Sequence, residues 1–270
     1  MCGTSRGPFG HRSLDASGRI HATTFHYCRA CDLIFRRVPP EVMSARFEGA
    51  GYTAPNNRVR LGRRREGFFQ FLLDLVERGL DRNRGSLLDV GASYGHLLRA
   101  AKDRGFEGQG VEIVDRLRRA IEADLGVRCW SDLHDVQGEF DVVTFVDSFY
   151  YFYEPHDAAR TVARLLRPGG LVVFRVMNRN LLVRALSALG STKGLELVGD
   201  GVVSWSMTGM KRLLPAHSME IEQIRFYERG WKRPVRTWLS YGPAVAASQL
   251  TRLVNQPVAP GLIVVARKMS

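Results

Sequence analysis

The sequence LLDVGASYGHLLRAA, residues Leu87 to Ala101, decides the fold class of this chain. An apolar run ends on Asp89, and a new one begins after four small residues, Gly91, Ala92, Ser93 and Gly95. Small residues allow a tight turn between a strand and a helix. They also let a cofactor lie against the backbone at a helix start. The stretch therefore predicts either tight strand–helix packing or a cofactor-binding turn.

Strands and helices alternate from this stretch onward. The apolar runs LLDV, QGVEIV, VRCW, FDVVTFV and LVVFRV predict five strands, and IEQIRFY and GLIVVARK predict two more. Between these strands, apolar residues at helical spacing predict one helix that ends at Arg104 and two more over residues 115–124 and 157–166. Apolar strands joined by helices are typical of parallel βαβ units buried on both faces. The chain is therefore predicted to be an α/β protein.

Two carboxylates follow the next strands in positions that suit a nucleoside. In an open α/β sheet the ligand lies beyond the carboxyl ends of the strands. Glu112, at the end of QGVEIV, could accept both hydroxyls of a ribose, and Asp132 in Ser-Asp-Leu could accept an adenine amino group. The alternatives are packing glycines, a surface acid at Glu112 and an ordinary turn or N-cap at Asp132.

The turn resembles the first motif of class I S-adenosylmethionine-dependent methyltransferases, D/E-x-G-x-G-x-G, with Ser93 in place of the middle glycine. The FDVV strand and the LLRPGGLVVF turn follow in family order, and the resemblance covers Glu66 to Lys268. It implies a Rossmann-like fold, a mostly parallel seven-stranded sheet with helices on both faces, and S-adenosylmethionine as cofactor. The implied cofactor-binding residues are Asp89, Gly91, Ala92, Ser93, Gly95, Glu112, Ile113, Asp132, Leu133 and Val146.

The loop VDSFYYFYEP after the fourth strand is expected to face the methyl group. The resembling family often reads V-L-E-H-x-P-D-P there, whereas this chain has Tyr150 and Tyr151 in place of Glu and His. Its four aromatic residues favour either a stacked or apolar acceptor or a packed lid. The candidate catalytic residues are Asp147, Tyr151, His156 and His217, with a base needed only if the acceptor is poorly ionised.

Three cysteines near the start of the chain suggest a metal. HYCRACDLIF resembles the second half of a zinc ribbon and supplies Cys28 and Cys31, with Cys2 as a third ligand. The first cysteine of the other pair is missing, so we expect that the start codon is placed too late, that His11 or His26 completes the site, or that the segment binds no metal. Cys129, in contrast, is expected in the core.

Three regions are expected along the chain. They are a loop-like, cysteine-rich, zinc-ribbon-like segment over residues 1–40, a connector over 41–65, and the methyltransferase domain over 66–270 with an acceptor-side insert at 178–206. The insert lies between the fifth strand and the next helix, where it could hold acceptor-selecting residues.

Composition favours a cytoplasmic protein, and the resemblance implies that it acts on a small molecule. The chain has 270 residues, 45% of them hydrophobic, and no apolar run long enough to cross a bilayer. Its net charge of +12 comes almost entirely from arginine, which makes a nucleic-acid partner possible but not favoured. We expect methyl transfer to a sugar, lipid-linked or secondary-metabolite acceptor. The alternatives are an RNA methyltransferase and a non-catalytic cofactor-binding homologue.

Overall fold

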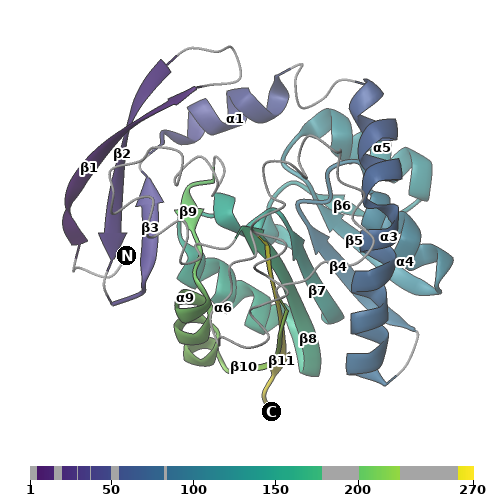
Figure 1. Cartoon of the computed structure of the whole chain (residues 1–270). Coiled ribbons are helices and arrows are strands. Elements are labelled where there is room, and N and C mark those ends of the chain that lie inside the picture. The colour runs from purple at the N-terminus through teal and green to yellow at the C-terminus, as the bar shows by residue number, and fades with distance from the viewer. Residues whose placement is uncertain are drawn as a thin grey trace.

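The computed structural model describes residues 5–14, 20–28, 30–36, 38–49, 55–81, 84–177, 201–225 and 261–270. Its larger sheet has seven strands in the order β10-β11-β8-β7-β4-β5-β6 (Figure 1). They are β4 (Gly85–Val90), β5 (Phe106–Val111), β6 (Cys129–Trp130), β7 (Phe140–Val146), β8 (Leu166–Met177), β10 (Met219–Arg225) and β11 (Gly261–Lys268). Only β11 is antiparallel to its neighbours in this sheet. The mostly parallel seven-stranded sheet is therefore confirmed.

The strand order reverses between β4 and β7. The chain leaves β4 for β5 and β6 on one side and returns to β7 on the other side of β4. Ligands of open α/β sheets bind in the crevice outside the carboxyl ends of the strands at such a reversal. A ligand site is therefore expected at the carboxyl ends of β4, β5 and β7.

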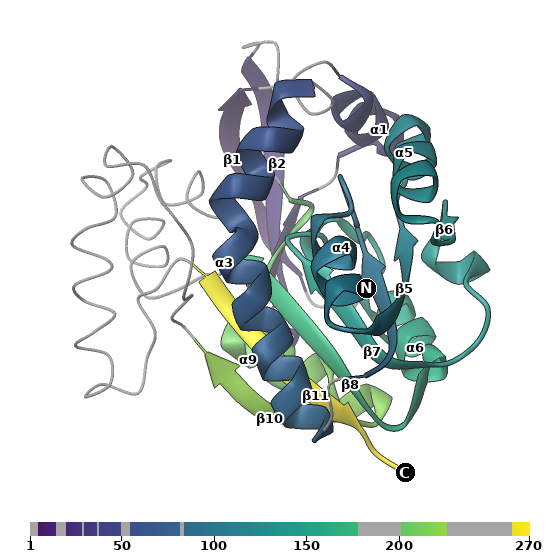
Figure 2. The ribbon, with the colours of Figure 1, turned by 90° about the vertical axis from the view of Figure 1, so that its right-hand side faces the viewer.

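Helices cover both faces of this sheet (Figures 1 and 2). Leu87 of β4 packs in a core with α3 (Pro55–Leu80), α4 (His96–Asp103) and α5 (Asp115–Leu125). Leu88 faces the opposite core, which includes α6 (Pro155–Leu165) and α9 (Met207–Leu213). This alternation is what a strand buried on both faces requires. None of the described helices is long and apolar enough to cross a bilayer.

A second, antiparallel sheet brings the start of the chain against the α/β part. Its order is β1-β2-β3-β9, with β1 (Ser5–Leu14), β2 (Ile20–Cys28), β3 (Leu33–Arg36) and β9 (Val203–Ser204). Because β9 comes from the far end of the chain, it ties the N-terminal strands to the larger sheet's domain. The helix α1 (Pro40–Glu48) follows β3, lies at the top of the view in Figure 1, and packs its Phe47 on Tyr151 of η2 (Phe149–Tyr151).

Several local expectations differ from the structure. The described part of residues 1–40 is not loop-like, because β1, β2 and β3 form a sheet through backbone pairing that their polar composition hides. The helix α3 begins at Pro55, within the expected connector. The Arg167–Gly170 turn interrupts the pairing of β7 with β8, which resumes at Leu171. Of the expected insert, residues 178–200 lie outside the described residues.

Candidate functional site

The turn between β4 and α4 depends on residues with positive φ. The φ angle is +82° at Gly91, +54° at Ser93 and +72° at Gly95. A Cβ added at Gly91 would lie 2.4 Å from the Cβ of Ser148, and one at Gly95 would lie 3.1 Å from Ile121. Both glycines therefore serve close packing. Their contact with a cofactor stays a prediction.

Glu112 holds this turn from the end of β5. Its Oε2 accepts the N–H of Ser93 at 2.7 Å, and its Oε1 accepts the N–H of Val114 at 2.9 Å. The residue is 3% exposed, so it is not a surface acid. Burial raises the pKa of Glu112, while hydrogen bonds from the backbone of Val114, Ser93 and Ile113 act to lower it. A carboxylate has about four acceptor positions, so at least one stays available for a hydroxyl of a ribose.

Asp89 lies in the centre of the same edge. It is 3% exposed and accepts a hydrogen bond from the Thr144 hydroxyl at 2.8 Å. Burial raises the pKa of Asp89 from 3.8 to about 7, because desolvation disfavours the charged form. A cation brought close to Asp89 would restore its ionised state.

The remaining predicted cofactor residues follow the strand ends. Ile113 is 61% exposed, which is unusual for a large apolar side chain beside a buried carboxylate and suits a stacked adenine. Asp132 caps η1 (Leu133–Asp135) by accepting the N–H of His134 at 2.8 Å, so the N-cap interpretation holds in this structure. Ala92 and Leu133 are buried and Val146 is half-buried at the end of β7.

Asp147, the first residue after β7, forms ion pairs with two arginines. Arg65 comes from α3 and Arg175 from β8, and each donates to a different oxygen of the carboxylate. Burial acts to raise the pKa of Asp147, but the charges of Arg175 and Arg65 outweigh it and hold the pKa below its usual value. Asp147 is therefore a weak base. Its two ion pairs suit a residue that holds the loop after β7 in position.

The aromatic residues after Asp147 divide into two groups. Phe149 is fully buried and packs between Phe174 and Trp205, with ring centroids 4.6 Å and 4.9 Å away. Tyr151 instead meets Phe47 of α1 edge-on at 4.8 Å. Burial raises the pKa of Tyr151, so its hydroxyl stays protonated at neutral pH and can donate a hydrogen bond.

The structure brings the two candidate histidines together. Nδ1 of His156 lies 3.0 Å from Nε2 of His217. Burial is the main reason that the pKa of His217 is lowered, and the neighbouring His156 contributes. The charges of Asp147 and of two arginines act on the pKa of Tyr151, and the charges of two arginines act on the pKa of Asp147. No histidine is among the strongest influences on either pKa. The four catalytic candidates therefore form two pairs.

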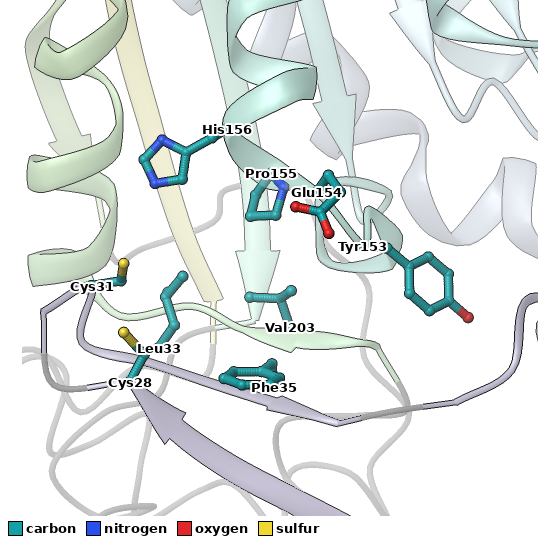
Figure 3. A pocket seen from close by; sticks show the side chains of 9 residues that line it. All are labelled: Cys28, Cys31, Leu33, Phe35, Tyr153, Glu154, Pro155, His156 and Val203. Atoms are coloured by element: carbon teal, nitrogen blue, oxygen red, sulfur yellow. The ribbon is translucent and has the colours of Figure 1, made fainter. Parts of the chain in front are cut away.

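A pocket lies between the N-terminal sheet and the start of α6 (Figure 3). Cys28, which is buried, and Cys31, which is half-buried, approach it from one side, and His156 from the other. Its other lining residues are Leu33, Phe35, Tyr153, Glu154, Pro155 and Val203.

The metal prediction is not settled by these side chains. Among the described residues, no three His, Cys, Asp or Glu side chains are arranged to hold a metal ion. Cys2 lies outside the described residues, and the ring of His26 stacks on Phe35 at 5.2 Å. Cys129 is buried in the core as expected. A zinc ion therefore stays a prediction.

Sequence reasoning missed the arginines of the site. Arg65 and Arg175 hold Asp147, yet they are 82 and 28 residues away from it along the chain. Arg36 of β3 and Arg46 of α1 act electrostatically on Tyr151. The only available signal was Arg175 itself, a charged residue inside the apolar strand LVVFRV, which indicates a buried partner.

Fold and site together define an α/β protein with buried carboxylates gathered at the reversal of strand order. The family model described as a methyltransferase domain matches residues 61–244. The chain therefore belongs to this methyltransferase family, whose fold is the class I, S-adenosylmethionine-dependent one.

Relatives and solved structures agree with this assignment. The chain is 32% identical over 138 residues to a ubiquinone biosynthesis O-methyltransferase of Alkalilimnicola ehrlichii, covering 47% of this chain and 55% of that protein. It thus spans about half the length of that curated relative. The plantazolicin methyltransferase BpumL, solved with SAH, aligns with a TM-score of 0.53 at 15% identity over 84% of this chain and 96% of that one. An S-adenosylmethionine-dependent methyltransferase of Mesorhizobium loti aligns with a TM-score of 0.51 at 19% identity, covering 74% and 97%.

Proposed function

We propose that the chain transfers the methyl group of S-adenosylmethionine to a hydroxyl of a small aromatic acceptor. The observation that carries this proposal is the meeting of three features at the carboxyl ends of adjacent strands. They are the Asp89–Gly95 turn after β4, the buried Glu112 after β5 and the loop from Asp147 to Tyr151 after β7.

The residues of the first two strand ends suit this cofactor. The proposed role of Glu112 is to accept ribose hydroxyls with the acceptor capacity that the backbone of Ser93, Ile113 and Val114 leaves free. Ile113 offers an exposed apolar surface to the adenine. The charged form of Asp89 is favoured beside the ammonium group of the methionine part. Asp132 remains in the proposed set through its place after β6.

The chemistry asks the chain mainly for alignment. When bound, S-adenosylmethionine supplies a methyl group activated by a sulfonium. Holding the acceptor oxygen in line with that methyl is a proximity effect that can reach roughly 7–11 kcal/mol. Tyr151, as a protonated donor, orients the acceptor. Asp147, fixed by Arg65 and Arg175, holds the loop that carries Tyr151.

Three observations favour a small aromatic acceptor with a hydroxyl. The loop offers Tyr151 for stacking, and the pocket beside it is lined mainly by apolar side chains. Arg36 and Arg46 near Tyr151 favour the ionised form of an acidic hydroxyl, which lessens the need for a carboxylate base. The similarity to proteins named O-methyltransferases supports transfer to oxygen.

Labelled S-adenosylmethionine tests this proposal directly. Purified protein is incubated with the labelled cofactor and either the small-molecule or the RNA fraction of a cell extract. We expect label in a small aromatic product. Label in RNA would replace the proposal with RNA methylation, and cofactor binding without transfer to either fraction would indicate a non-catalytic homologue.

A structural zinc ion at the N-terminal cysteines is a separate proposal, supported by the spacing of Cys28 and Cys31. We expect about one zinc per chain by metal analysis, lost in Cys28→Ser and Cys31→Ser. Protein that carries no metal when purified would contradict it.

A further inference from the structure

His134 lies between two carboxylates, one at each of its ring nitrogens. Nδ1 lies 2.8 Å from Oδ1 of Asp132, the residue that caps η1. Nε2 lies 2.7 Å from Oδ2 of Asp157, in the first turn of α6. An ionised carboxylate only accepts hydrogen bonds, so both ring nitrogens must carry a proton for both bonds to form. The geometry is therefore that of a positively charged imidazolium.

The charged groups around His134 favour this protonated form. The hydrogen bond with Asp132 is the main reason that the pKa of His134 is raised above 6.5, and Asp157 adds to it, while burial opposes both. The other oxygen of Asp157 accepts a hydrogen bond from Arg160 of the same helix at 2.8 Å. Asp135 of η1 is exposed and is not among the main influences on the pKa of His134. His134 therefore changes from charged to neutral above pH 6.5.

The bonds with His134 leave one oxygen of Asp132 available. Oδ1 accepts both the backbone N–H and the ring Nδ1–H of His134, each at 2.8 Å. Oδ2 makes no hydrogen bond or ion pair with the described part of the chain, and the side chain of Asp132 is 59% exposed. In the proposed function Asp132 lies beside the adenine. Oδ2 is therefore the acceptor that Asp132 offers to the adenine amino group.

The ring of His134 limits how this carboxylate can turn. An exposed side chain samples several rotamers unless hydrogen bonds hold it, and the backbone N–H alone holds Asp132 at one point. A neutral imidazole has a single N–H, so it donates to only one of the two carboxylates at a time. Deprotonation also removes a positive charge beside Asp132, but water screens this effect because both side chains are at least half exposed. We therefore expect the orienting effect to exceed the charge effect.

We propose that His134 is a positioning residue that orients Asp132 toward the adenine amino group, and that it does so fully only when its ring is doubly protonated. The inference rests on the proposed function and adds to it a pH-dependent selectivity for adenine. Because Asp157 lies in the first turn of α6, the same ring joins the cofactor edge to the helix that follows the loop after β7.

Two ligands measure this selectivity, S-adenosylhomocysteine and its 6-deamino analogue, which carries purine in place of adenine. Titration calorimetry gives the ratio of their affinities, from which the titration of their identical amino-acid parts cancels. For the wild type at pH 6, S-adenosylhomocysteine should bind about tenfold or more tightly, because the analogue lacks the donor to a charged acceptor. At pH 9 this ratio should be smaller by about threefold or more, because His134 is then neutral.

Three substitutions assign the pH dependence to the ring of His134. In His134→Asn, the amide N–H replaces the Nδ1–H, so the ratio at pH 6 should be kept and should no longer change with pH. In His134→Leu, both ring bonds are lost, and the ratio at pH 6 should fall to the wild-type value at pH 9 or below. In Asp157→Ala, one of the groups that raise the pKa of His134 is gone, so the fall in the ratio should move to lower pH.

Asp135→Asn is the control, since it removes a charge from an exposed position of η1, and it should keep both the ratio and its pH dependence. A wild-type ratio near one, or one that stays constant or rises between pH 6 and pH 9, would overturn the inference. A pH dependence that survives in His134→Leu or His134→Asn would overturn it as well. Failure of the wild type to bind S-adenosylhomocysteine would instead contradict the proposed function.

Discussion

Burial acts to raise the pKa of both carboxylates that frame the site, but their neighbours give them opposite net shifts. Asp89 has only the Thr144 hydroxyl as a hydrogen-bonding side-chain partner among the described residues, and its pKa is raised to about 7. Asp147 is half-buried, and the charges of Arg175 and Arg65 lower its pKa against the effect of burial. The nearest charges, more than burial, therefore decide which of the two is ionised at neutral pH.

We expect Asp89→Asn to increase the free energy of unfolding at pH 8 and to leave it nearly unchanged at about pH 4. The folded pKa of Asp89 is about 7, against an ordinary value of 3.8. The folded state therefore keeps a proton that the unfolded state releases above about pH 4. The stability gained from this proton is present below the ordinary pKa and is lost as the pH rises through 7. Asparagine does not ionise, so the Asp89→Asn variant keeps this stability as the pH rises.

Urea unfolding of both proteins across this pH range measures the effect. Asp103→Asn, at an exposed position on α4, provides the control and should show no such change. A stability difference that does not grow with pH would mean that Asp89 is ionised in the folded protein.

Tyr151→Phe should lower kcat/KM for the acceptor by about tenfold or more, because it removes the hydroxyl that we propose orients the acceptor. Affinity for S-adenosylhomocysteine should stay the same. The control is Tyr153→Phe, whose hydroxyl is used by the Val38 carbonyl, and it should change stability more than kinetics. Steady-state kinetics with the acceptor found by labelling measure both. An unchanged kcat/KM in Tyr151→Phe would leave Tyr151 as a stacking surface only.

At the scale of elements, Asp147 joins the helix α3 to the strand β8. We expect Asp147→Asn to cost about 3 kcal/mol of stability at neutral pH, because it leaves two largely buried arginines without their anion. The folded pKa is depressed, so this stability is present above the ordinary pKa and is lost as the pH falls through the folded value. The gap between the variant and the wild type should therefore narrow in acid.

Urea unfolding at pH 7 and at about pH 3 checks both parts of this prediction. Asp124→Asn breaks an exposed pair with Arg58 and should cost about 1 kcal/mol or less. Similar costs for the two variants would show that the Asp147 pairs are no stronger than surface ones.

The turn between β4 and α4 packs against the start of the loop after β7. Gly91→Ala should cost about 2–3 kcal/mol, because φ is positive and the new Cβ would overlap Ser148. Gly105→Ala is the matched control, since its φ is +88° and nothing lies within 4 Å of the added Cβ. The second substitution Ser148→Gly should restore part of the loss in Gly91→Ala. Equal costs at Gly91 and Gly105 would contradict the packing role.

At the scale of the whole molecule, the sequence could predict what local patterns encode. Apolar runs such as FDVVTFV and the turn around Gly91 specify strand, turn and helix within a few residues, so the α/β fold could be predicted from them. The strands β1 and β2 were missed because their Gly, Ser, Arg and His residues show no clear alternation. Long-range partners were missed too.

The acceptor side of the site depends on those long-range partners. Arg36 acts electrostatically on Tyr151 from β3, which pairs with β9 and so lies beside a segment far along the chain. Asp147 is positioned by arginines from a helix that precedes it and a strand that follows it. No local pattern encodes such contacts, since tertiary packing alone selects them. The four residues predicted to be catalytic from their type alone therefore lie in two separate pairs.

Titration calorimetry with S-adenosylhomocysteine tests the central claim most directly. We expect micromolar binding to the wild type. In Glu112→Gln, binding should be weaker by roughly 1.5–3 kcal/mol, because a charged acceptor for the ribose hydroxyls is lost. Binding to Glu107→Gln, at an exposed position on the same strand, should be unchanged. Undiminished binding in Glu112→Gln, or a wild type that prefers a nicotinamide cofactor, would contradict the account.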